Sequence, residues 1–293
     1  MNSMSGSLAQ YTQIYWGGEI ALYLFLAGLS AGAMIVAVLL RRAGLAGLDL
    51  KGSVLAPGFK AAVLTAPLAI VLGLGLLVLD LGKPLSFYWI LLRYNWDSVM
   101  SIGVALLLVY TPLAFAYAFI AFLGSSLAKP LLRAINLIEP LLILLALGVG
   151  AYTGFLLSAV AKIALWHNWV LPLLFLASAI SAGAACVGLF AGAGSRASAL
   201  VLRIDVVAIV FEIVFLGALF AGLGKDGVAA VLSGGWGVVF FALVLGVGLA
   251  LPLLLSKAHS KLAVMIKCSA VLVGVLALRY FIVYAGQISA ISI

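Results

Sequence analysis

The chain has 293 residues, of which 67% are hydrophobic and only 8% are charged, and its formal net charge is +8. Soluble globular domains carry about 25% charged residues, so too few are present here to cover a water-soluble surface. The positive charge could suggest nucleic-acid binding, but the sequence has no basic segment interleaved with aromatic residues. The composition therefore indicates an integral membrane protein and excludes a soluble enzyme.

Eight apolar stretches are long enough to cross a hydrocarbon core of ~30 Å, which takes about 20 helical residues. In chain order they cover residues 17–40, 60–80, 98–123, 137–158, 170–192, 203–223, 235–256 and 263–287. They lack the strict alternation of a membrane β-strand. Because a helix satisfies its own backbone polar groups in lipid, we predict an all-α integral membrane fold with eight transmembrane helices.

The connections between these stretches are short, the longest being about twenty residues, which leaves room for one membrane domain over residues 1–293. A loop around Trp166 follows the fourth stretch and divides the chain in the middle. We therefore expect two four-helix bundles, one formed within residues 17–158 and the other within residues 170–287.

The basic residues predict how the helices are oriented. The loops that follow the odd-numbered helices, with the adjacent helix ends, hold Arg41, Arg42, Lys51, Lys60, Lys129, Arg133, Arg196, Arg203, Lys257, Lys261 and Lys267. The opposite side holds only Lys83, Arg93, Lys162 and Lys225, and Arg279 falls inside the eighth helix. By the positive-inside rule the richer side is cytoplasmic, so both termini should face the outer side of an inner membrane.

The cysteines and histidines argue against a metal centre in this chain. Cys186 and Cys268 are solitary, and no CxxC motif or Cys/His cluster exists, which disfavours iron–sulfur and zinc sites. His167 and His259 fall on opposite sides of the membrane in the predicted topology, so they cannot hold one b-type haem between them. We expect no haem and no metal here, and any cofactor would be diffusible or belong to a partner.

Polar residues at membrane depth need a specific reason, because inserting a charge there costs roughly 2.5–3.5 kcal/mol. An outer layer contains Glu19 and Tyr23, which share a helix face four residues apart. Tyr152 has a computed depth similar to that of Tyr23, and Asp80 ends the second helix. A carboxylate and phenols converging at one depth could hydrogen-bond a quinone and exchange protons with it. Alternatively, the carboxylates are interfacial and the tyrosines belong to an aromatic belt.

A second, deeper layer contains Asp205 and Glu212, which lie on one face of the sixth predicted helix, seven residues apart. Arg279 has a comparable mid-membrane depth, and Glu139 begins the fourth helix on the inner side. These acids could relay protons inward, with Arg279 neutralising Glu212. The alternative is a structural Glu212–Arg279 ion pair, with Asp205 only capping its helix.

Five segments carry a resemblance to a known family. They are WGGEIALYLFLAGLSAGA in the first helix, the LDLGKP turn, YTGFLLS in the fourth helix, the Asp205/Glu212 pair and LRYFIVYAGQ in the eighth helix. In this order, and with eight helices, the chain resembles the polysulfide reductase membrane-subunit family (NrfD/PsrC-like) along essentially its whole length. One departure concerns the first helix, where some relatives place an Asn or His near the quinone and this chain has Glu19 and Tyr23.

The resemblance implies the membrane anchor of a molybdopterin oxidoreductase complex in anaerobic respiration, located in the cytoplasmic membrane of a bacterium or archaeon. Such an anchor binds no haem and exchanges electrons between menaquinone and an iron–sulfur subunit on the outer side, where the molybdopterin catalytic subunit also lies. In that family the functional positions correspond to Tyr23, Asp80, Tyr152, Asp205, Glu212 and Arg279. We expect Tyr23, Asp80, Tyr152 and Glu19 to bind the quinone, and Glu139, Asp205, Glu212 and Arg279 to conduct protons.

Two other functions are compatible with the intramembrane charges. A proton-coupled secondary transporter would use carboxylates and an arginine at membrane depth, although the sequence shows no internal symmetry and no paired broken helices. A passive anchor would only tether a partner, and it would tolerate removal of the charges at Glu212 and Arg279.

Overall fold

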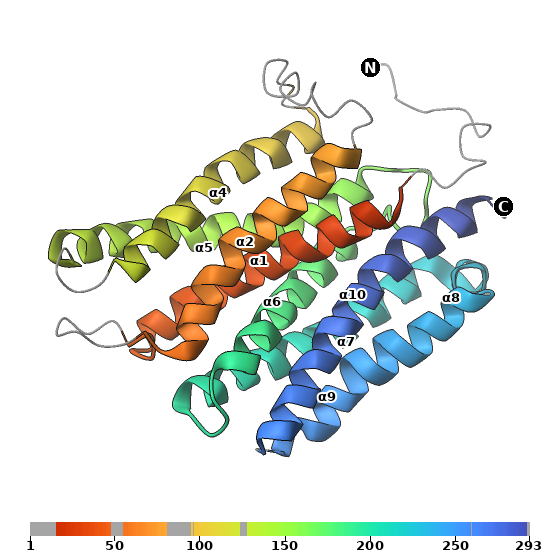
Figure 1. Ribbon diagram of the computed structural model, residues 1–293. Coiled ribbons are helices and arrows are strands. Elements are labelled where there is room, and N and C mark those ends of the chain that lie inside the picture. Colours follow the sequence, from red (N-terminus) through yellow and green to blue (C-terminus); the bar gives the residue numbers. More distant parts are fainter. Residues whose placement is uncertain are drawn as a thin grey trace.

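The computed structural model describes residues 16–47, 55–80, 95, 97–123, 128–258 and 260–291. Its long helices are α1 (Gly18–Arg42), α2 (Pro57–Asp80), α4 (Val99–Phe122), α5 (Ala128–Ser158), α6 (Val170–Phe190), α7 (Arg196–Val231) and α10 (Lys261–Ile291), which Figure 1 labels. Between α7 and α10 the chain is helical through α8 (Gly235–Val238), the π-helix η3 (Val239–Ala250), α9 (Leu251–Leu254) and the short 3₁₀ turn η4 (Leu255–Lys257).

Eight helical spans in the described part of the chain are long and apolar enough to cross a membrane, which confirms the predicted all-α fold and helix number. Two helices begin well before their predicted starts: α5 at Ala128 instead of residue 137, and α7 at Arg196 instead of residue 203. The start of α7 has a local cause. Helix α7 begins at Arg196 because the Ser195 hydroxyl caps it by accepting a hydrogen bond from the Ser198 backbone N–H. Its predicted end is close to Gly224, where a φ of 70° interrupts the helix.

The membrane-facing surface is formed mainly by helices on the outside of the assembly. Leu72 of α2, Phe119 of α4 and Val214 of α7 are all exposed, and they belong to a large set of exposed apolar side chains on these helices. Apolar side chains facing outward are what a hydrocarbon environment requires. The lateral surface of the protein is therefore suited to lipid.

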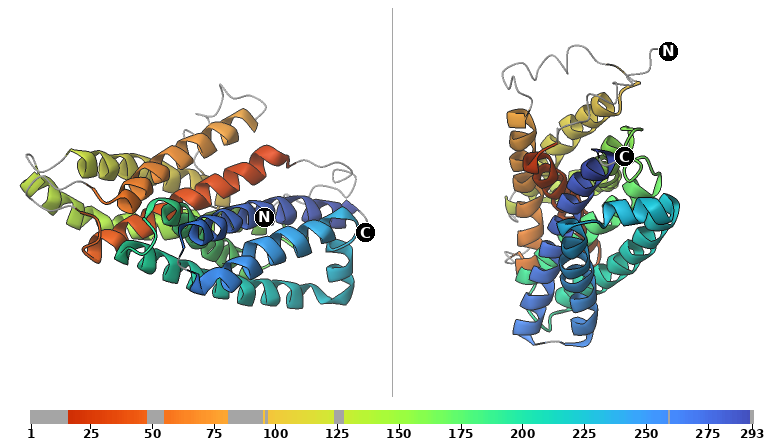
Figure 2. Two further views of the ribbon diagram at one scale, coloured as in Figure 1. Left: turned by 60° about the horizontal axis from the view of Figure 1, so that its bottom comes forward. Right: turned by 90° about the vertical axis from the view of Figure 1, so that its right-hand side faces the viewer.

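Helices α1 and α6 lie at the centre. In each of them, 78% of an 18-residue apolar segment is buried inside the protein. Helix α1 contacts α2, α5, α6 and α10, and the views of Figure 2 show it surrounded by these helices. At the α1–α6 crossing, Gly32 packs directly on the backbone of Ala179 and Gly183, where a side chain would collide. Small residues allow this close approach of two helices in lipid.

Two ends of the helices can be distinguished by their side chains. We call the end that carries Arg41, Arg42, Arg196, Lys257 and Lys261 the basic end, and the end that carries Trp16, Trp166 and Trp236 the aromatic end. The N- and C-terminal helix ends lie together at the aromatic end, as Figure 1 shows for α1 and α10. Which end faces the cytoplasm, the division into two four-helix bundles and the single membrane domain stay predictions.

Replacing Gly32 by alanine should destabilise the protein, because its methyl group would meet the Ala179 carbonyl at the α1–α6 crossing. Overpacking of this kind costs about 1–3 kcal/mol. Gly75→Ala is the matched control, because nothing lies within 4 Å of a Cβ at that helical position. Thermal unfolding in detergent should show a lower midpoint for Gly32→Ala only. Equal midpoints for the two variants would contradict the crossing described here.

Candidate functional site

Tyr23 and Tyr152 are buried together near the aromatic end. Tyr23 is fully buried on α1, and its ring packs against Gly73 of α2, where a Cβ would lie 3.3 Å from the ring. Tyr152 of α5 packs on the backbone of Gly103 in α4, where any side chain would collide with the phenol. The two phenols are close enough to interact electrostatically. The Tyr23 hydroxyl has no hydrogen-bond partner among the described residues.

Glu19 and Asp80 lie closer to the aromatic end than this pair of tyrosines. Both are exposed, and they are close enough to interact electrostatically. The Glu19 carboxylate folds back over Gly17, away from the membrane interior. The carboxylates therefore differ from the buried tyrosines in their exposure, and the prediction that all four residues bind a quinone stays a prediction. The remainder of the LDLGKP turn, residues 81–84, lies outside the described residues.

Two tyrosines of α10, which were not among the predicted site residues, also lie at the aromatic end. The hydroxyl groups of Tyr280 and Tyr284 approach Gly18, where a Cβ would lie 3.3 and 3.6 Å from them. Tyr284 also stacks on Trp236 with ring centroids 5.2 Å apart. The four-residue spacing in RYFIVY, which places both rings on one face, was the available signal.

Glu139 lies near the basic end and has a complete set of partners. Its carboxylate accepts hydrogen bonds from the Arg41 Nε, from the Arg42 Nε at 3.0 Å and from the Tyr117 hydroxyl at 3.1 Å. Arg41 also donates to the Asn136 side chain. These contacts join α1, α4 and α5. The structure does not link Glu139 to the other predicted proton-path residues, since none of the interactions described for it involves them.

Asp205 of α7 has a partner, Lys267 of α10, that was not among the predicted site residues. Its carboxylate accepts a hydrogen bond from Ser181 of α6 at 2.8 Å and lies 3.6 Å from the Lys267 Nζ of α10. Both members of this ion pair are buried. Lys267 was counted with the charges at the helix ends, but it lies inside α10 in the apolar segment AVMIKCSAV, which was the available signal. Asp205 does not cap α7, since Ser195 does.

Arg279 of α10 is fully buried at the interface with α6. Its guanidinium donates hydrogen bonds to the Phe175 carbonyl at 3.0 Å and to the Ser178 hydroxyl at 2.7 Å, and it lies 3.6 Å from the centre of the Phe175 ring. No ion pair within 4.0 Å joins it to Glu212, so the proposed direct Glu212–Arg279 pair is wrong. The physical reason is that α6 holds the guanidinium. The two groups still interact electrostatically.

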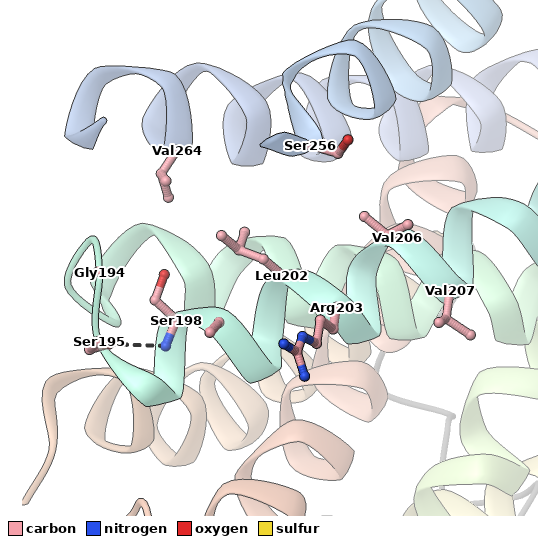
Figure 3. Close-up of a pocket in the computed structure, with 10 residues that line it drawn as sticks. Gly194, Ser195, Ser198, Leu202, Arg203, Val206, Val207, Ser256 and Val264 are labelled. Atoms are coloured by element: carbon pink, nitrogen blue, oxygen red, sulfur yellow. Dashed lines mark hydrogen bonds between the residues drawn. The ribbon is translucent and has the colours of Figure 1, made fainter. Parts of the chain in front are cut away.

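A cavity of about 680 Å³ opens at the basic end between α7, η4 and α10. Figure 3 shows that Ser198, Leu202 and Val206 lie along α7 below Val264 of α10 and Ser256, and the dashed line marks the Ser195 cap. None of the predicted site residues lines this cavity. A second groove of about 430 Å³ between α6 and α7 is almost wholly apolar.

Comparison with known proteins identifies the family. The sequence model described as "Polysulphide reductase, NrfD" matches residues 6–290. The protein is 40% identical to the C subunit of polysulfide reductase from Wolinella succinogenes, across 98% of its own length and 99% of that subunit. It is 38% identical to protein NrfD of Escherichia coli, across 97% of its own length and 98% of that protein.

This chain belongs to the NrfD/polysulphide reductase family. An NrfD homolog of Haemophilus influenzae is also 32% identical across 94% of the chain and 95% of that protein. With its eight spans, this member of the NrfD family is a multi-pass integral protein of the bacterial inner membrane.

The described residues of this NrfD-family protein contain no group of three or more His, Cys, Asp or Glu side chains that could hold a metal ion. His259 lies outside them. The expectation that the protein binds neither haem nor metal stays a prediction.

The contacts of Glu139 predict that its replacement by glutamine affects stability first. The change removes two ion pairs with arginines from a buried carboxylate, and hydrogen bonds to charged groups contribute about 1.5–3 kcal/mol each. We expect a lower unfolding midpoint in detergent, with Glu19→Gln at an exposed glutamate as control. An unchanged midpoint would contradict a structural role and favour Glu139 as a proton carrier.

Proposed function

We propose that this protein is the quinone-reactive membrane subunit of a respiratory oxidoreductase complex. It exchanges electrons between menaquinol, bound near the aromatic end, and an iron–sulfur subunit that passes them to a molybdopterin catalytic subunit. Family membership supports the general assignment, and the relative named as one subunit of polysulfide reductase supports a reductase built from several polypeptides. The excess of basic residues at the opposite end supports an outer location for the quinone pocket and the partner subunits.

The unpaired Tyr23 hydroxyl is the observation that carries this proposal. A buried polar group usually has a hydrogen-bond partner, and this one lies beside the Tyr152 ring with none in the described part of the chain. A quinone ring fits these surroundings, because it is flat and apolar and its two oxygens can accept or donate hydrogen bonds. Tyr23 would donate to one quinone oxygen, with Tyr152 beside it.

The carboxylates above the tyrosines fit the proton chemistry of a quinol. Oxidation of menaquinol to menaquinone releases two electrons and two protons. Asp80 and Glu19 are exposed at the aromatic end, so they can accept protons and pass them to water. The electrons leave to the iron–sulfur subunit. The reverse sequence reduces menaquinone.

A second route for protons would lie between α6, α7 and α10. Asp205, Glu212 and Arg279 are buried there between the two ends of the helices, and buried ionisable groups in membranes commonly mark proton paths. Glu139 would belong to this route only if its contacts with Arg41 and Arg42 opened. We therefore assign the route to Asp205, Glu212 and Arg279.

Tyr23→Phe and Asp80→Asn should each abolish quinol-dependent turnover while the complex still assembles. Removing one well-placed hydrogen-bond donor typically lowers a rate by about 10²–10³-fold. Tyr110→Phe is the matched control, since this buried tyrosine is hydrogen-bonded to Ser30 away from the proposed pocket. Co-purified iron and molybdenum measure assembly. Wild-type turnover in both site variants would show that the pocket is assigned wrongly.

Glu212→Gln separates the proposed function from a passive anchor. The change removes a buried ionisable carboxyl group and nearly keeps the side-chain shape, so we expect turnover at least about tenfold below wild type in an assembled complex. A passive anchor predicts unchanged turnover. A proton-coupled transporter instead predicts solute uptake by the isolated protein in liposomes that contain no redox partner, and such uptake would refute the proposal.

A further inference from the structure

The cavity at the basic end runs along α7 beside the buried ion pair. Leu202 and Val264 line it, and Asp205 and Lys267 each follow three residues later on α7 and α10. Residues three apart share a helix face, separated by about 4.5 Å along the axis. Val206, the residue after Asp205, also lines the cavity, so the ion pair lies behind the cavity wall, within about one helical turn of lining residues on both helices. The cavity wall also includes Ser195, Ser198 and Ser256, whose hydroxyl groups suit water.

The ion pair is poorly suited to a purely structural role. The Lys267 Nζ and the Asp205 Oδ2 are 3.6 Å apart, and neither has a hydrogen-bond partner among the described residues. Burying two charges carries a desolvation cost that only excellent geometry offsets. By contrast, Glu139 at the same end of the helices makes three hydrogen bonds. A loose, buried pair can rearrange at a smaller cost than a fully bonded one.

Further polar atoms that have no hydrogen-bond partner among the described residues continue from the ion pair toward mid-membrane. They are the Glu212 Oε1 and the Nε and Nη1 of Arg279. Buried polar atoms of this kind commonly bind internal water, which bridges two to four groups. The helix geometry puts Glu212 about 10 Å beyond Asp205 on α7. Internal water between them would connect the ion pair to Glu212.

Acidic and basic side chains are equal in number in this group of four. Asp205 and Glu212 are acids, Lys267 and Arg279 are bases, and all four are buried. Among the described residues, the thiols of Cys186 and Cys268 also lie near the pair, and the positively charged Arg203 lines the cavity. Because Asp205 and Glu212 interact electrostatically, a proton on one affects the other. The Lys267 ammonium stabilises the negative charge of Asp205 and competes with a proton for it.

We propose that the cavity at the basic end is the proton vestibule of this protein and that the Lys267–Asp205 ion pair is its gate. A proton from the vestibule binds Asp205 and releases it from Lys267, then passes through water to Glu212. Lys267 then pairs with the ionised Asp205 again, which blocks return of the proton. Lys267 is a positioning residue in this scheme. The inference rests on the proposed function for the use of the protons, and adds where they enter and what controls them.

The first test follows proton movement in liposomes that contain the assembled complex and an internal pH dye. In Lys267→Met, proton uptake from the basic end should fall about tenfold, whereas Lys267→Arg, which keeps the charge, should restore most of it. Lys261→Met is the matched control, since Lys261 is exposed on the same helix. Unchanged proton uptake in Lys267→Met would overturn the proposal.

A double variant covers the case in which Lys267→Met fails to fold because it leaves Asp205 unpaired. Lys267→Met with Asp205→Asn removes both charges and keeps the region neutral, so this variant should assemble. Its proton uptake should still be lost, and wild-type uptake would overturn the gate.

Infrared spectroscopy of the purified protein separates this inference from the proposed function. Lys267→Met should add the C=O stretching band of a protonated carboxylic acid, and the double variant should lack that band. No added band would contradict the gate. This measurement needs no quinol, so it tests Lys267 even if the wild-type complex proves inactive with quinol, an outcome that would refute only the proposed function.

Discussion

The close crossing of α1 and α6 determines where the other helices can lie. Gly32 and Gly183 bring the two backbones into contact, and without a hydrophobic driving force in lipid such packing is a main source of helix association. Helix α1 therefore presents Tyr23 to α2 and α5 on one side. On its other side Gly28 lies beside the Arg279 guanidinium of α10, 3.5 Å from where a Cβ would be. One helix thus borders both polar regions of the protein.

Two clusters of buried charge near the basic end differ in how well their atoms are bonded. The Glu139 carboxylate accepts hydrogen bonds from two arginines and a tyrosine, which fix α1, α4 and α5 relative to one another. The Asp205–Lys267 pair has one hydrogen bond, from Ser181, and leaves two atoms without partners among the described residues. Fully satisfied polar networks rigidify a protein. The partly satisfied pair lies between helices that line a cavity, where movement of water and protons is physically reasonable.

The aromatic end contains hydrogen bonds that hold helices together, and also a buried hydroxyl group that can still bind a ligand. Trp166 donates a hydrogen bond to the Ile282 carbonyl at 2.7 Å, and Gln287 exchanges hydrogen bonds with the backbone of Trp16. These contacts fasten the start of α1 to α10. The Tyr23 hydroxyl, on the side of α1 that faces α2, is buried and has no partner in the described part of the protein, which fits a site completed by a bound molecule. This contrast supports the proposed quinone pocket for a member of the NrfD family.

The sequence by itself determined the eight membrane helices, because lipid requires long apolar segments with internally bonded backbones, and it indicated the family through five ordered segments. It also indicated that Tyr23, Tyr152, Asp205 and Arg279 lie at membrane depth, where the cost of inserting a polar group requires a structural or functional explanation. Only the tertiary structure decided their partners. Lys267 forms an ion pair with Asp205, and Arg41 and Arg42 form ion pairs with Glu139. Arg279 donates hydrogen bonds to Phe175 and Ser178. Helical periodicity gives the depth and face of a side chain, but partners on different helices depend on how the helices cross, and that is set by close contacts such as Gly32 on Ala179.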